Sequence, residues 1–159
     1  SKEEIAQKEV DTVFLNEEKK WVDSLKANPG DTNILFQLGV VYYNEGVRQL
    51  QMIDSLKYQR MLQDTNLIEI PLSTLLVESE EIDLKDIEGR TYAVFEKALG
   101  CFKRSFELGG HRQHLLEGLV GCSVIQGAMS DAYNFDSISV RLGYPALLKK
   151  DNEDHKIKV

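Results

Sequence analysis

The stretch DTNILFQLGVVYYNEG, residues 31–46, decides between a strand and a helix near the start of the chain. A strand would be interrupted by Gly39, which has no side chain to pack in a sheet. Helical spacing fits better, because the apolar residues recur at i, i+1, i+4, i+7 and i+8. They are Ile34, Leu35, Leu38, Val41 and Tyr42. A glycine inside a helix costs roughly 1 kcal/mol relative to alanine, so we predict that a neighbouring helix approaches closely at Gly39.

Local signals set the expected ends of this helix. Asp31 or Thr32 can cap its N-terminus. Residues 44–46, NEG, are typical of a C-terminal stop, so we expect the helix to end at Gly46. A separate helix over residues 47–63 is predicted to follow.

The same periodicity predicts helices along most of the chain, separated by prolines and glycines. The first block is helical up to the breakers at residues 28–30, and a later helix runs from about residue 84 to the glycine pair at 109–110. Two more follow, one ending near Gly127 and one over residues 128–142. The sequence therefore predicts an all-α fold.

Residues 1–148 are predicted to form a single helical domain. An inserted loop at about residues 64–86 interrupts it, with apolar side chains packed down and an acidic run facing water. Residues 149–159, KKDNEDHKIKV, are predicted to be a charged flexible tail.

Length and charge limit the classes of function. A chain of 159 residues fits one domain. With 19 Lys and Arg against 26 Asp and Glu, its net charge of −7 argues against a nucleic-acid partner, because phosphate binding needs a basic face. No segment approaches the roughly 18 apolar residues of a membrane span, so no direct membrane insertion is expected. We expect a cytoplasmic protein; a removed N-terminal signal would place it in the cell envelope or periplasm instead.

Residues that could carry chemistry are few. His111, His114 and Glu117 are spaced to begin a metal site on one helix, but a third and fourth ligand and the usual motifs are missing, so we expect no metal. Cys101 and Cys122 fall inside predicted helices, where free thiols behave as small apolar groups; a disulfide between them stays open. With no catalytic or phosphate-binding motif, we expect neither an enzyme nor a cofactor.

The helix of residues 31–46 resembles the first helix of the tetratricopeptide repeat (TPR) family, whose pattern is W-x2-L-G-x2-Y, then A-x3-F, then P. Leu38, Gly39 and Tyr42 match it. Trp21 and Pro29 stand eight apart, as do the second-helix aromatic and closing proline of the family. The resemblance implies antiparallel helix-turn-helix repeats of the TPR-like α-solenoid type, with an inserted irregular segment.

The later part of the chain matches the family less regularly. Ala98 and Phe102 reproduce A-x3-F, and the next helix keeps Leu116 and Leu119 but replaces the glycine. A repeat of about 34 residues would place the aromatic near Ser55, so Phe102 comes later than a regular array allows. Either residues 47–63 are a divergent second helix, which we prefer, or a long segment is inserted inside one repeat. An ordinary antiparallel helical bundle remains the alternative to an array.

The resemblance implies a concave groove lined by first-helix side chains, which binds an extended peptide or a partner helix. Phe36 and Tyr43 would be its aromatic anchors, and Asn33 and Asn44 its hydrogen-bonding residues. Since the set contains no Lys or Arg, apolar or amide-bearing partners are expected. The implied groove residues are Asn33, Phe36, Val40, Tyr43 and Asn44, then His114, Glu117, Gly121 and Val124.

Two other functions stay open beside this non-enzymatic interaction module or scaffold. In one, the apolar insert encloses a pocket for a small hydrophobic ligand, which makes the chain an accessory binding protein. In the other, exposed apolar faces at the ends of the array drive self-association. The lining of the pocket would be Leu67, Ile68, Ile70, Leu72, Leu75 and Leu76.

Overall fold

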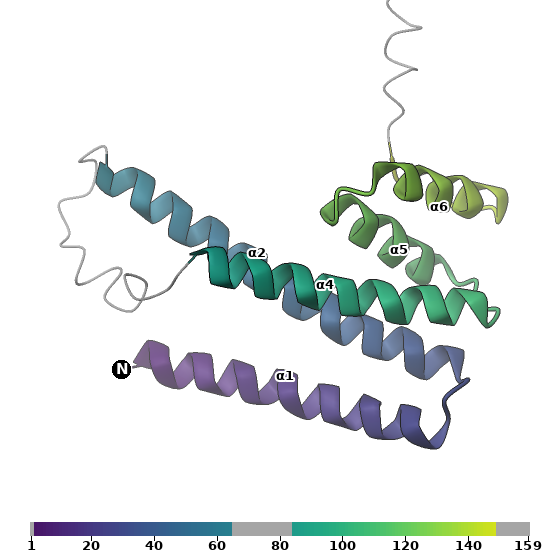
Figure 1. Ribbon diagram of the computed structural model, residues 1–159, viewed down its shortest axis with the longest axis horizontal. Coiled ribbons are helices and arrows are strands. Elements are labelled where there is room, and N and C mark those ends of the chain that lie inside the picture. Colours follow the sequence, from purple (N-terminus) through teal and green to yellow (C-terminus); the bar gives the residue numbers. More distant parts are fainter. Residues whose placement is uncertain (1, 65–83, 149–159) are drawn as a thin grey trace, which may run out of the picture.

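The computed structural model describes residues 2–64 and 84–148, and within these ranges the chain is helical with no strand, which confirms the all-α prediction. The helices are shown in Figure 1. Their bounds are α1 Lys2–Ala27, α2 Thr32–Asp64, α4 Leu84–Glu107, α5 Gln113–Ile125 and α6 Met129–Arg141.

Each helix packs on the next one along the chain, and α2 also contacts α5. In Figure 1, α1, α2 and α4 run side by side, while α5 lies against one half of α4 and α6 lies on α5. The C-terminal half of α2 and the N-terminal half of α4 therefore extend past the last two helices.

Local signals place most helix ends correctly. The carboxylate of Asp31 accepts hydrogen bonds from the backbone N–H groups of Asn33 and Ile34, at 2.9 and 3.0 Å, and so caps α2. Helices α4 and α6 are followed by Gly109 and Gly143, with φ of 100° and 94°, a conformation that favours glycine at a helix C-terminus. These ends were predicted from the glycine pattern.

The predicted helix stop at Gly46 is wrong, since α2 continues to Asp64 without a break. Gly46 serves packing instead: a Cβ atom there would lie 2.6 Å from Cζ of Phe95 in α4. The preferred interpretation of residues 47–63 as a separate second helix is therefore also wrong. The expected loop bounds shift too, because residue 64 ends α2 and residues 84–86 begin α4; residues 65–83 and the tail lie outside the described residues.

Helices α2 and α4 form one long antiparallel pair with a steady register. The close contact of Gly39 with Phe102 repeats two turns further along α2, where Gly46 meets Phe95 two turns earlier in α4. Further along, the pair has its own small core of Ile53, Leu56 and Ile87, and we call this part, residues 47–62 and 84–93, the arm. The residues of the arm thus lengthen the α2–α4 helix pair.

The main core lies where α1, α2, α4, α5 and α6 meet. Tyr42 is buried there and packs edge-on against Phe14, as expected for a structural residue. The buried members of this core are Phe36, Leu38, Tyr42, Phe95, Ala98, Phe102, Leu115, Leu116, Leu119 and Cys122.

Four residues in or just after α4 each have a counterpart in or just after α6. Every pair is separated by the same number of residues as Ala98 and Ala132. The backbone agrees, because the N–H after each helix reaches back to an equivalent carbonyl: Gly110 to Ser105, and Tyr144 to Ser139. The matched residues are Ala98, Phe102, Ser105 and Gly109 in or after α4, and Ala132, Asp136, Ser139 and Gly143 in or after α6.

Candidate partner-binding surface

The groove residues predicted on α2 do not share one environment. Asn33 and Asn44 are exposed, and Val40 is half-buried against the core. Of the two expected anchors, Phe36 is buried in the core and Tyr43 is partly buried against it. The polar part of the predicted set is therefore accessible to a partner, whereas the aromatic part is packed within the protein.

Phe36 is only 8% exposed, so the expectation that it anchors a partner is corrected. Its ring packs against that of Phe102, with centroids 6.1 Å apart. The guanidinium of Arg112 lies over the ring of Phe36, 4.8 Å from its centroid, as a cation–π contact. Phe36 therefore joins the start of α5 to α2 and α4.

Tyr43 packs at the junction of α2, α4 and α5. Its ring meets Phe95 edge-on at a centroid distance of 5.6 Å, and its hydroxyl lies 3.1 Å from where a Cβ atom on Gly121 would be. Burial, with a smaller contribution from Cys122, raises the pKa of its hydroxyl. Tyr43, like Tyr42, is thus a packing residue, and Gly121 leaves room for it.

The residues predicted on α5 are more accessible. His114 is exposed and pairs with Glu117 through a contact of 2.9 Å between Nδ1 and a carboxylate oxygen. Val124 is 39% exposed, a large value for an apolar side chain on a helix that packs on three others. The α5 part of the predicted set therefore faces outward at both ends of the helix.

A single packing relationship explains this difference between α2 and α5. The stripe of α2 that contains Phe36 and Tyr43 is covered by α5, which contacts α2 directly. On α5 the corresponding positions are Glu117, which is partly exposed, and Val124, which is exposed. We call this set of residues the α2–α5 surface; it consists of the exposed Asn33, Asn44, His114 and Val124 and the partly exposed Val40, Glu117 and Gly121.

Arg112 adds a charge that the sequence-based set lacked. It is exposed and stands directly before α5, with its guanidinium above Phe36. Nothing local in the sequence links Arg112 to a residue as distant as Phe36; only the packing of α5 on α2 brings them together. One end of the α2–α5 surface is therefore cationic.

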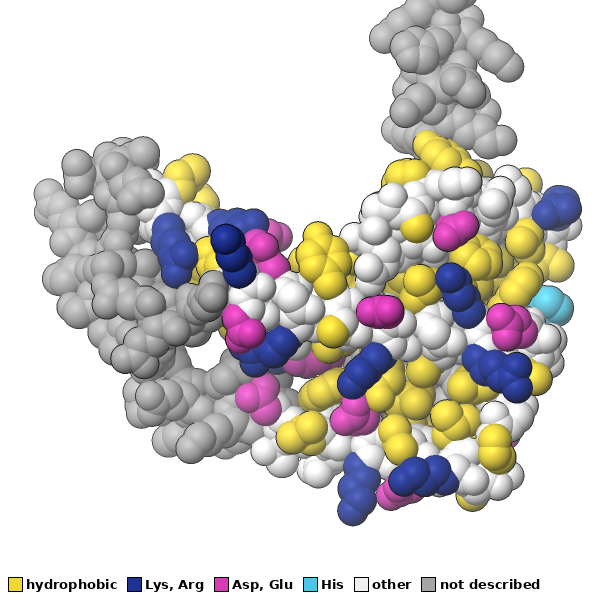
Figure 2. Space-filling view, in the orientation of Figure 1, with side chains coloured by type: hydrophobic (Ala, Val, Ile, Leu, Met, Phe, Trp, Pro, Cys, Tyr) yellow, Lys and Arg dark blue, Asp and Glu magenta, His cyan; other side chains and the backbone are white. Residues whose placement is uncertain are grey.

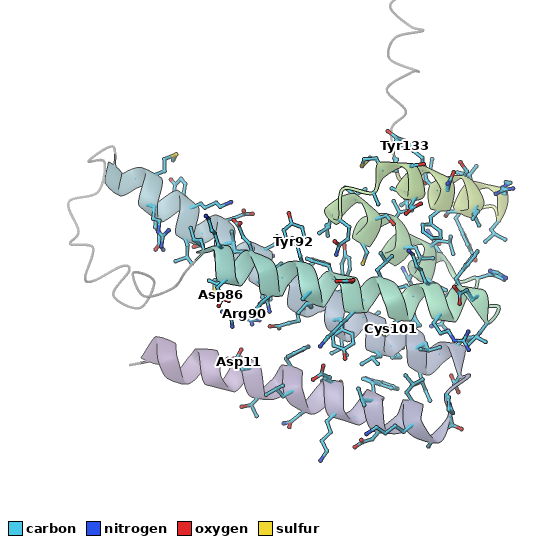
Figure 3. All side chains as sticks on the ribbon, in the orientation of Figure 1. Asp11, Asp86, Arg90, Tyr92, Cys101 and Tyr133 are labelled. Atoms are coloured by element: carbon cyan, nitrogen blue, oxygen red, sulfur yellow. The ribbon has the colours of Figure 1, made fainter. Side chains whose placement is uncertain are left out.

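A second accessible apolar residue, Tyr92 of α4, was not predicted. It is 53% exposed and stands on the floor of a hollow between the arm and the α5–α6 side of the molecule (Figures 2 and 3). The side-chain amide of Gln126 donates to the backbone carbonyl of Tyr92 at 3.1 Å, on the α5 side of this hollow. Arg90 and Asp86, which form an ion pair at 3.2 Å, project from the opposite side of α4 (Figure 3).

The chemical groups in the described residues do not assemble into a reactive centre. Burial raises the pKa of Cys101 to about 11 and that of Cys122 to about 12, so both remain neutral, free thiols. Within residues 2–64 and 84–148, no three His, Cys, Asp or Glu side chains gather in a way that could hold a metal ion. None of the helices in these ranges is long and apolar enough to span a membrane.

Comparison with known proteins gives no relative for this chain. No family model, curated protein or solved structure matches it.

Proposed function

We propose that this chain is a non-enzymatic interaction module that binds an extended peptide or a partner helix along the α2–α5 surface. The observation that carries the proposal is the exposure of His114 and Val124 on α5, at positions that correspond in sequence to the stripe of α2 on which α5 packs. Val124 offers an accessible apolar contact beside the polar groups of this surface.

Features that the chain shares with TPR-like arrays support this proposal. Successive helices pack on one another, and α4 and α6 share positions at the spacing from Ala98 to Ala132. That spacing equals one tetratricopeptide repeat of about 34 residues. In such arrays, stacked helix pairs present an extended surface to partners. The arm then corresponds to a segment inserted within one repeat, which accounts for the late position of Phe102.

The chemistry of the surface indicates the kind of partner. The amides of Asn33 and Asn44 can hydrogen-bond to an extended backbone, and Val40 and Val124 can contact apolar side chains. Arg112 favours an acidic group at one end of the ligand. The proposed ligand is therefore a peptide with apolar and amide side chains and one carboxylate.

The experiment is a selection of binders from a random peptide library against the intact protein, followed by titration of the selected peptides. Val124→Asp should weaken binding about tenfold or more, since loss of a central apolar contact costs on the order of 1–2 kcal/mol. Val13→Asp is the matched control, because Val13 is exposed on α1, away from this surface. Peptides that bind both variants as tightly as the wild type, or a selection that yields no binder, would reject the proposal.

The hydrophobic-ligand alternative has no support of its own. Its expected lining residues all lie between residues 65 and 83, outside the described part of the chain. We therefore propose only the interaction function.

A further inference from the structure

One stripe of α2 continues from the main core into the arm. It contains Tyr43, whose hydroxyl reaches the position of Gly121 in α5, so this part of the stripe faces α5. From Tyr43 onward its members recur at alternating intervals of four and three residues, which keeps them on one face of the helix. The part of the stripe beyond α5 therefore lies on the same side of the molecule as α5. We call this part the arm stripe; it consists of Leu50, Asp54, Lys57 and Met61.

Tyr92 marks the point at which α4 extends past α5 and α6. It precedes Leu99 and Phe106 by two and four turns of α4, so the three side chains share one face of that helix. Phe106 packs edge-on against Phe135 of α6, with ring centroids 6.2 Å apart, so this face is directed toward the α5–α6 side. Tyr92 points from it into the hollow beside the arm (Figure 3). The arm stripe and Tyr92 therefore line the same hollow.

Large apolar side chains of the arm are exposed to water here. Met61 is 51% exposed and Tyr92 is 53% exposed. Tyr58, at the edge of the arm stripe, is 60% exposed. Tyrosine and methionine are among the residues enriched in protein–protein interfaces. Covering these three side chains removes apolar surface from water and so favours association.

The arm stripe is complementary to itself when two copies of α2 lie antiparallel. Leu50 of one copy then lies opposite Met61 of the other, which pairs two apolar side chains. The same register places Asp54 opposite Lys57, because both pairs are centred on one point of the helix, between residues 55 and 56. A two-fold axis at that point repeats each contact. One orientation of a second copy thus satisfies the apolar and the charged members of the stripe together.

The charged members of the stripe are accessible to a second copy. Asp54 is exposed, and Lys57 has a side chain that is 57% exposed. Lys57 forms an ion pair with Glu88 of α4 at 3.1 Å, which holds its ammonium group above the helix pair. An ammonium group has three donors, so it can bind Asp54 of a second copy while it keeps Glu88.

The shape of the molecule allows the same arrangement. Gly46 of α2 lies beside Phe95 of α4, and the two helices are antiparallel. Tyr92, one turn from Phe95, therefore stands near the level of Leu50. In the antiparallel register the tip of the other arm, which carries Met61, reaches this level. The hollow is open on the side away from α1 (Figure 2), so the arm of each copy can enter the hollow of the other.

We propose that two copies of this chain associate through their arms, each arm lying in the hollow of the other. Leu50 of one copy contacts Met61 of the other, and Asp54 pairs with Lys57 across the two-fold axis. The apolar side chains supply the attraction, and the ion pairs fix the register. This interface uses no residue of the α2–α5 surface, and the proposal does not depend on the function assigned to that surface.

Molar mass from light scattering tests the association. In a concentration series up to about 1 mM, which reveals even a weak interface, the wild type should rise from the mass of one chain toward that of two. Met61→Asp should raise the dissociation constant about tenfold or more, because it replaces a buried apolar contact by a charge. Val13→Asp is the matched control, since Val13 is equally apolar and exposed but lies on α1. A wild type that stays monomeric throughout, or equal effects of the two variants, would overturn the proposal.

Charge reversal tests the register. Asp54→Lys and Lys57→Asp each place like charges opposite one another, so each variant alone should dimerise about tenfold or more weakly. An equimolar mixture of the two should dimerise again. In that mixture the introduced lysine faces the introduced aspartate, while the native Asp54 of one variant faces the native Lys57 of the other.

Recovery in the mixture also shows that both variants are folded. Asp23→Lys is the control for the change in net charge, because Asp23 is an exposed acid on α1, and this variant should dimerise like the wild type. A dimer that persists in both single reversals, or a mixture that stays as weakly associated as its components, would overturn the proposed interface.

Discussion

The ring of Phe102 fills the space in which a Cβ atom on Gly39 would lie, 2.5 Å from its Cε1. On its other side, the same ring stands 2.6 Å from where a Cβ atom on Gly118 would be. Phe102 is therefore held between α2 and α5, and it sets the spacing of the two helices that form the α2–α5 surface. The ring cannot move away from one glycine without approaching the other.

Gly39→Ala should destabilise the protein. The new methyl group overpacks the core, which costs about 1–3 kcal/mol, and the better helix propensity of alanine returns up to about 1 kcal/mol. We expect a net loss of about 1–2 kcal/mol in the free energy of unfolding, measured by urea denaturation.

Gly100→Ala is the matched control for this prediction. Gly100 also lies inside a helix, but nothing is within 4 Å of the position of its Cβ atom. This variant should gain about 0.5–1 kcal/mol. A stabilised Gly39→Ala variant would show that α2 and α4 do not approach as closely as described.

The arm should unfold on its own before the main core. Its small cluster of Ile53, Leu56 and Ile87 is separate from the core around Phe102. Ile53→Ala should lower the stability of the arm by about 2–4 kcal/mol. Hydrogen exchange should accelerate over residues 50–60 and stay unchanged over residues 36–43. Equal acceleration in both segments would mean that arm and core unfold as one unit.

The buried thiols make stability depend on pH in the alkaline range. In the unfolded chain the pKa of each thiol is about 8.5. In the folded chain the pKa of Cys101 is about 11 and that of Cys122 is about 12. The folded state then binds more protons, so stability is full below about pH 8.5 and falls as pH rises.

Denaturation at pH 9 and pH 10 measures this effect. Each thiol should lower the free energy of unfolding by about 1 kcal/mol over this interval, and Cys122→Ala should remove roughly half of the combined slope. In the native protein at pH 8, neither thiol should react with a thiol reagent as fast as in urea. A flat stability profile between pH 8 and pH 10 would contradict the burial of both groups.

Asp31→Ala should cost about 1 kcal/mol, because the N–H groups of Asn33 and Ile34 lose their acceptor. Asp23→Ala serves as the control, since Asp23 is an exposed acid on α1. Urea denaturation of both variants tests the cap. Equal stability of the two variants would mean that the Asp31 carboxylate does not stabilise the N-terminus of α2.

The sequence predicts features that depend on neighbours along the chain. The cap at Asp31 and the ends near Gly109 and Gly143 depend on residues within a few positions, so turn and cap chemistry was sufficient to place them. Gly39 was also interpreted correctly, because the stripe around it left no role except close packing.

Features that depend on distant residues were not predicted. Gly46 has the same appearance as a helix stop, and only Phe95, far along the chain, shows that it is a packing glycine. Tyr43 was expected to face a partner, but α5 covers it. Tyr92 and Arg112 gave no signal, because their exposure depends on where α5 begins and ends.

Amide chemical-shift mapping can locate the site at which a peptide binds and so tests the proposed role of the α2–α5 surface. When a selected peptide is titrated into the labelled protein, the largest shifts should fall on Asn33, Asn44, Glu117 and Val124, and Val124→Asp should remove them. The amides on the exposed side of α1 around Val13 should not shift. Shifts centred on Tyr92 or on α6 instead would show that the peptide does not bind at the α2–α5 surface.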